Sequence, residues 1–508
     1  MESLLNTRSV RMSQRIMDRQ EECPISGDYV LPEYCPDIAV ILKCFAYPHI
    51  QSRQWSGEQL LLDGVVDVRM LYLDEDRQCV RCFEFAQPFS CSVRGNAKTD
   101  ATAVELRLLT KYLNCRAVSP RRVEVRGAIT VCAQAECGVD VDIAEPMEIQ
   151  GFFCRADKMP VTIPGNISEK VMSISESLEF DQSLPPAEML LGGECQAIIK
   201  ECKLLAGKAI IKGLVYIHQL YTDTVDGKYT HALLFAVPFS QIMDVADAQE
   251  GLLCRAAVQI LSDTERCSVG PDGENTMLDV TIKLLLQVQI YCPSEVTILQ
   301  DAFHCRYPIH AKNENVAIEA LVGQRFEETR LSVSSQLPAG QWQEVVDVWA
   351  QPQETKTECI DGKAVCQGRM QIGVIVRDND GELSCHEFYE DYRLEYPVEG
   401  NAATIVPTVI GVNYRINDNK VEMQILLHIC ITVTRCAQLS AIKELSLLEE
   451  SPYPTTKANT LLYYANRGET IWDIGRQCHA SPTAIAHENN LSGETVAESC
   501  VLIVPIVS

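Results

Sequence analysis

The sequence has few basic residues for its acidic content, no long apolar runs and none of the short motifs of common enzymes. It contains 44 Lys and Arg against 69 Asp and Glu, a net charge of −25. Such a chain is repelled by nucleic-acid phosphates and by anionic membrane surfaces, so neither is expected as a partner. No run approaches the roughly 18–20 apolar residues of a membrane helix, and no secretory signal opens the chain. We therefore expect a cytoplasmic protein without a transmembrane segment.

Catalytic and metal-binding motifs are also missing. There is no Walker loop, G-x-S-x-G or G-x-G-x-x-G, and His386-Glu387 lacks the second histidine of a zinc-binding H-E-x-x-H. Asp380-Gly381 fits a hairpin turn better than a calcium loop. The single C-x-x-C, from Cys79 to Cys82, has no second pair, so the 23 scattered cysteines are expected to be reduced and mostly buried. We predict no catalytic residues, no metal, no cofactor and no enzymatic activity.

One arrangement of residues occurs three times. A Leu-Pro pair is followed 28–32 residues later by a glycine within alternating apolar residues, then by an acidic turn and a return strand. The pairs begin at Leu31, Leu184 and Leu337, and the glycines are Gly64, Gly213 and Gly368. The glycines lie 149 and 155 residues apart, which is the size of a domain and too long for a solenoid repeat.

Each copy offers six or more short strands separated by turn residues, and helical periodicity is scarce. This pattern is typical of an all-β sandwich or barrel. We predict three tandem β-sandwich-like repeats over residues 1–155, 156–311 and 312–448. The central glycine of each is expected to mark a bulge or a close backbone approach. Residues 449–458, with two prolines among polar residues, form a predicted linker.

The tail, residues 459–508, follows a different pattern. Thr470 and Asp473 predict a helix N-terminus, and Ser481-Pro482 predicts a second one. Strands are expected at each end of the tail, which makes the order β-α-α-β. Ile471 and Ile474 can fill the inner face of the first helix, leaving Trp472 free at the edge of the domain. An exposed tryptophan beside a groove is a natural binding anchor; the alternative is that Trp472 belongs to the core.

The tail resembles a LysM domain. The similarity rests on Tyr464, the Arg467–Trp472 stretch, Ile485, the Asn489–Leu491 stretch and the Leu502–Pro505 stretch. LysM domains bind N-acetylglucosamine polymers in a groove between the loop before the first helix and the loop after the second. The resemblance therefore implies a partner- or glycan-binding groove formed by Arg467, Gly468, Glu469, Thr470, Trp472, Asn489, Asn490 and Leu491.

Three repeats followed by one LysM-like tail resemble the SPOCS-domain proteins of endospore-forming bacteria. The resemblance implies a mother-cell protein at the forespore surface that helps attach the basal spore coat. Its LysM domain would bind a coat-morphogenetic ATPase of the SpoIVA type. The alternative is a protein that binds peptidoglycan or another N-acetylglucosamine polymer in the cell or spore envelope.

Overall fold

The computed structural model describes residues 5–75, 79–95, 102–146, 149–224, 229–338, 340, 342–417, 419–454 and 458–506. The protein is mainly β, as expected, with two short helices near its C-terminus. Asp76 and the Asp226-Gly227 turn lie outside the described residues. None of the helices in the described ranges is long and apolar enough to span a membrane.

Eighteen strands form three groups of six, and the strand order is the same in each group. The first group comprises β1 (Leu5–Val30), β2 (Val40–Ser56), β3 (Gln59–Leu73), β4 (Val80–Arg94), β5 (Thr102–Ser119) and β6 (Arg122–Pro146). The second comprises β7 (Phe152–Glu179), β8 (Ala187–Leu205), β9 (Lys208–Asp223), β10 (Thr230–Asp244), β11 (Leu253–Ser268) and β12 (Met277–His304). The third comprises β13 (Ile309–Gln336), β14 (Trp342–Ile360), β15 (Lys363–Asp378), β16 (Leu383–Pro397), β17 (Ala402–Asn417) and β18 (Lys420–Leu447).

Each group contains two antiparallel three-stranded sheets. Its second, third and fourth strands form one meander, β2-β3-β4, β8-β9-β10 or β14-β15-β16. In the other sheet the last strand lies between the first and the fifth, in the orders β1-β6-β5, β7-β12-β11 and β13-β18-β17. The first and last strands of each group are therefore hydrogen-bonded neighbours, which closes each group on itself.

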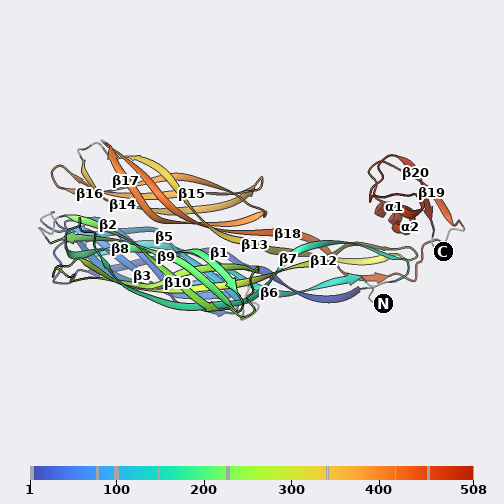
Figure 1. Cartoon of the computed structure of the whole chain (residues 1–508), viewed down its shortest axis with the longest axis horizontal. Helices are drawn as coiled ribbons and strands as arrows, with labels where there is room; N and C mark the ends of the chain where they lie inside the picture. Colours follow the sequence, from blue (N-terminus) through green and yellow to red (C-terminus); the bar gives the residue numbers. More distant parts are fainter. Residues whose placement is uncertain are drawn as a thin grey trace.

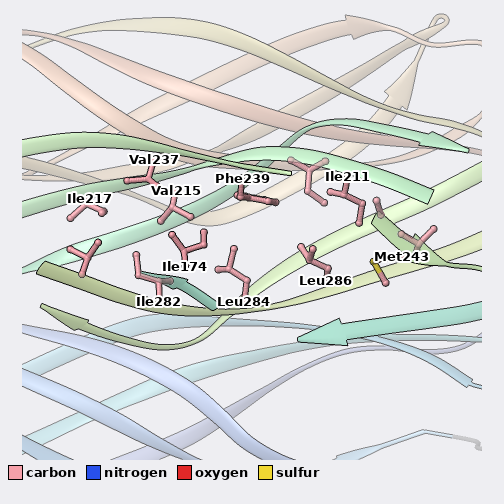
Figure 2. Packing of buried hydrophobic residues seen from close by; sticks show 14 of the residues in the cluster. Ile174, Ile211, Val215, Ile217, Val237, Phe239, Met243, Ile282, Leu284 and Leu286 are labelled. Atoms are coloured by element: carbon pink, nitrogen blue, oxygen red, sulfur yellow. The ribbon is translucent and has the colours of Figure 1, made fainter. Parts of the chain in front are cut away.

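The two sheets of a group enclose an apolar core, as period-2 alternation requires. In the second group, Ile211, Val215 and Ile217 on β9 face Ile282 and Leu284 on β12 (Figure 2). All five are at most 1% exposed. Corresponding clusters fill the first and third groups.

The three central glycines lie in like environments. Each is paired across the sheet with an aromatic residue: Gly64 with Phe89, Gly213 with Phe239 and Gly368 with Tyr392. A Cβ at any of them would lie closer than 3.0 Å to that aromatic side chain and to a backbone carbonyl of the preceding strand. The register shifts at all three places, so the predicted bulge is present.

The first and last strands are longer than the sequence suggests. Strand-like alternation in the sequence opens the three repeats over 8–20, 169–180 and 325–334, but β7 and β13 begin at Phe152 and Ile309. Pro160 and Pro164 interrupt the strand-like sequence pattern in the outer half of β7, so this half was not predicted. Proline is tolerated there because β7 pairs only with β12 and needs no donor on its free edge.

The extended halves of these strands form three two-stranded ribbons, which we call the stalk: β1 with β6, β7 with β12, and β13 with β18. The remaining parts of the three groups, which we call the body, lie side by side, and the ribbons project together from one end of it (Figure 1). Met12, Ile143, Val161, Ile298 and Ile318 form a buried cluster that draws on all three. Two-stranded ribbons are weak alone, so this shared core stabilises them.

A second apolar cluster joins the three groups at the meander sheets, and we call it the junction. Leu71, Leu220 and Ile375, each seven residues after a central glycine, are buried together there. Cys82 of the C-x-x-C pair packs beside them. Near the junction both faces of the meander strands are covered, which explains why alternation gives way to continuous burial at Met70–Leu73.

Candidate partner-binding site in the C-terminal tail

The tail comprises β19 (Thr460–Ala465), α1 (Ile471–Cys478), α2 (Pro482–Glu488) and β20 (Cys500–Pro505), in the predicted order. It lies beside the far end of the stalk (Figure 1). β19 and β20 pair antiparallel, and the two helices cover one face of this sheet. The core of the tail includes Ile471, Ile474, Ile485 and Leu502, all at most 6% exposed.

Both helices begin at the predicted caps. The Thr470 hydroxyl oxygen accepts a 3.0 Å hydrogen bond from the backbone N–H of Asp473. Ser481 accepts from Ala484 at 3.2 Å, and Pro482 occupies the first turn, where its missing N–H leaves no bond unmade. These local bonds fix the directions of α1 and α2 and the loops that precede them.

The loop before α1 is held by its own residues. Glu469 accepts from the backbone N–H and the side-chain amide of Asn466, at 3.0 and 3.1 Å. Gly468 has a φ of +89°, and its N–H donates to the carbonyl of Val496 at 2.9 Å. Arg467 stays exposed. The Glu469 carboxylate therefore organises the loop, while Arg467 and Gly468 are exposed at its surface.

The loop after α2 is fastened to β20. The Asn489 side chain donates to the carbonyl of Ile503 at 2.7 Å and accepts from the Ile503 N–H at 2.8 Å. Asn490 is exposed with a φ of +50°, and Leu491 packs partly into the tail core. Of these three predicted groove residues, Asn490 is the one left open to solvent.

Trp472 lies outside the core of the tail, but its indole is not free. The ring packs edge-on against Phe303 with centroids 5.0 Å apart, and Nε1 donates to Asp301 at 3.0 Å. Both partners belong to β12, at the end of the stalk. The expectation of an unobstructed indole was wrong, because it considered the tail without the ribbon that packs against it.

Sequence reasoning missed an apolar surface on the tail. Leu462 and Tyr464 on β19 pair with Ile503 and Val501 on β20, and these four side chains are 42–78% exposed. We call them the strand face. The helices cover the opposite face of the sheet, and the exposed fractions show that the strand face is open to solvent in the described part of the chain. The available signal was that both strands are apolar at nearly every position.

Comparison with known protein families identifies part of the first and second strand groups. The family model of the SipL SPOCS domain matches residues 37–118 and 186–265. The chain carries SPOCS domains of the SipL type. This match indicates a sporulation-related protein. Neither the curated proteins nor the solved structures compared with the chain give a match.

The two SPOCS segments cover equivalent structure. The first runs through β2, β3, β4 and most of β5, and the second through β8, β9, β10 and most of β11. Both contain the meander sheet with its central glycine and the following strand. The third group repeats this strand order.

Polar contacts join one SPOCS segment to the next group. Arg69 of the first donates to the carbonyl of Gly193 in the second at 2.6 Å, and His218 of the second lies 3.0 Å from Asp347 of the third group. Burial lowers the pKa of His218, but Asp347 and Glu194 outweigh it and raise this pKa above its usual value. Arg69 and His218 are both five residues after a central glycine, so equivalent positions provide the links between groups.

Proposed function

We propose that the chain is a non-enzymatic adaptor of spore-envelope assembly. In this proposal all three strand groups, β1–β6, β7–β12 and β13–β18, are SPOCS repeats, residues 449–458 are a linker and 459–508 are a LysM domain. The tail captures a coat-morphogenetic ATPase of the SpoIVA type and helps attach the basal coat. The protein acts in the mother-cell cytoplasm, at the forespore surface.

The repetition of one topology supports the assignment of the body. Two groups carry the family match over equivalent strands, and the third has the same strand order, bulge and glycine–aromatic pair. The β-α-α-β order and the two capped helices of the tail support the LysM assignment. Two ion pairs with little exposure cross between groups, His218 with Asp347 and Arg255 with Glu136, and they support groups that act together as a scaffold.

The strand face is the observation that favours a protein partner over a glycan. Contiguous exposed apolar side chains on a small domain mark protein–protein contact sites. Glu469 and Asn489, which a polar glycan could use, are already hydrogen-bonded within the tail. The solvent-exposed Arg467, Gly468 and Asn490 keep a glycan polymer as the alternative ligand.

Capture of the purified ATPase by the full chain tests this proposal. Changing Leu462 and Ile503 together to Glu should weaken capture by about thirtyfold or more, since hot-spot residues contribute roughly 2 kcal/mol each. Leu234→Glu is the matched control, because Leu234 on β10 is 67% exposed and Leu462 is 66% exposed. Equal capture by the double variant and by the control would contradict the role of the strand face. Binding of the unchanged chain to peptidoglycan, with no capture of the ATPase, would favour the glycan alternative.

A further inference from the structure

Six polar side chains meet where the first and second strand groups touch. Cys195 on β8 and Asp263 and Glu265 on β11 come from the second group, and each offers a ligand atom within 4.8 Å of the others. The Cys195 Sγ lies 3.4 Å from Glu265 Oε1. His49 on β2 of the first group places its Nε2 3.8 Å from Asp263 Oδ1. The other two are Tyr47 and Arg69, also from the first group.

A thiol, an imidazole and two carboxylates are the ligand types that zinc takes in proteins. We propose that Cys195, Asp263, Glu265 and His49 form a site for a divalent transition metal, with zinc as the best-fitting ion. The ligands come from both groups, so the bound ion links the first SPOCS segment to the second.

Two of the separations between ligand atoms can be compared with those of a tetrahedral zinc centre, and both are near them. Zinc–sulfur and zinc–oxygen bonds of about 2.3 and 2.0 Å put the two ligand atoms about 3.5 Å apart. The Cys195–Glu265 separation of 3.4 Å is close to this value. The His49–Asp263 separation of 3.8 Å is a few tenths of an ångström longer than the about 3.3 Å expected for nitrogen and oxygen ligands. The same Nε2 lies 3.7 Å from Asp67 Oδ2, so the imidazole has to turn from Asp67 toward Asp263 when the ion binds.

Arg69 lies near the carboxylate oxygens of Asp263 and Glu265 that point away from the proposed ion. Its Nη2 lies 3.4 Å from Glu265 Oε2 and 4.0 Å from Asp263 Oδ2, so the oxygens directed at Cys195 and His49 are not those that Arg69 contacts. Its Nη1 donates to the Gly193 carbonyl at 2.6 Å, and its guanidinium lies 5.1 Å from the Tyr47 ring centroid. A partner that orients a ligand from behind is a regular part of metal sites.

Charge and access favour a cation. Asp263 and Glu265 have side chains 14% and 5% exposed, and Arg69 also pairs with Glu84 at 3.0 Å. One guanidinium therefore faces three carboxylates, two of them with little exposure, and charge removed from water is costly unless it is paired. His49, Cys195 and Asp263 also line a cavity of about 370 Å³ between the three groups, which gives an ion and water a place beside the cluster.

Metal titration of the full chain tests the site. Protein kept in reductant and stripped with a chelator should bind about one equivalent of zinc tightly, with a rise in melting temperature. Cobalt in its place should give a thiolate-to-cobalt charge-transfer band. Cys195→Ser should lose this band, and Asp263→Asn should bind zinc at least about tenfold more weakly.

Cys202→Ser is the matched control, because Cys202 lies on the same strand and its sulfur is 3.7 Å from that of Cys254. This control variant should still bind one equivalent of zinc tightly. Asp263→Asn preserves side-chain shape, and circular dichroism of every variant checks its fold. If Cys195 merely donates an S–H hydrogen bond to Glu265, the unchanged chain will bind zinc no more tightly than Cys195→Ser. That result would overturn the proposal. So would tight binding of one equivalent of zinc by both Cys195→Ser and Asp263→Asn.

Discussion

The indole nitrogen of Trp472 donates to Asp301, and the same carboxylate oxygen accepts from Arg476 at 2.8 Å. Trp472 and Arg476 lie one turn apart on α1, while Asp301 lies near the end of β12. One carboxylate at the tip of the stalk therefore receives two donors from the tail. Phe303 supports the contact by packing against the indole ring.

Asp301→Ala should release the tail from the stalk without unfolding it. A hydrogen bond to a charged group contributes about 1.5–3 kcal/mol, and the half-exposed Arg476 pair contributes up to about 1 kcal/mol. Small-angle scattering of the full chain should show a larger radius of gyration. Asp157→Ala is the control: Asp157, on the same ribbon, accepts from Gln300. An unchanged scattering curve for Asp301→Ala would mean that the rest of the contact suffices.

The same variant tests the predicted role of Trp472. If Trp472 anchors the ATPase, the ribbon competes with the partner, and Asp301→Ala should strengthen capture. Trp472→Glu should then abolish capture while the chain keeps its circular dichroism and melting temperature. Capture that neither variant changes would exclude Trp472 from the binding surface.

Gly213→Ala should destabilise the second group. The added carbon would meet the Ile198 carbonyl and the Phe239 ring, and backbone cannot move aside as a flexible side chain can. Overpacking of this kind costs about 1–3 kcal/mol, measurable by denaturant unfolding. Gly323→Ala should be nearly neutral, since nothing lies within 4 Å of the position that its Cβ would take. Similar unfolding midpoints for the two variants would show that the bulge relaxes.

The contact of His218 with Asp347 should make stability depend on pH. Because the folded state raises the pKa of His218, the contribution is complete below the unfolded-state pKa of about 6.5. It is lost as pH rises through the higher folded-state pKa. Thermal unfolding of the unchanged chain and of His218→Gln should therefore differ most at mildly acidic pH and converge at alkaline pH. A constant difference would assign His218 a packing role alone.

Leu220→Ala should loosen the association of the three groups. Leu220 is 3% exposed in the junction with Leu71 and Ile375, and a buried Leu→Ala change costs about 2–5 kcal/mol. Because the junction is shared, Leu71→Ala and Leu220→Ala should be non-additive in unfolding experiments. Leu234→Ala, at an exposed site, should cost little. Strict additivity of the two junction variants would argue for groups that unfold independently.

The sequence by itself determined what depends on neighbours along the chain. Alternation and turn residues specified strands, the recurring glycines located the bulges, and Thr470 and Ser481 specified the starts of both helices. These signals are local because strand periodicity, caps and bulges involve residues only a few positions apart or in the adjacent strand. Even so, the outer halves of β7 and β13 escaped detection, because prolines and polar residues are tolerated on edge strands.

The tertiary structure decided how the groups meet. The stalk, the junction and the contact of Trp472 with Asp301 join residues separated by more than a hundred positions, and no local pattern records such pairs. The cluster of His49, Cys195, Asp263 and Glu265 is the clearest case. Asp263 and Glu265 are close in sequence, on one face of β11, but His49 and Cys195 lie far from them along the chain. The four residues therefore match no known metal motif, and the sequence predicted no metal. Only the packing of two strand groups against each other brings His49 to the other three ligands.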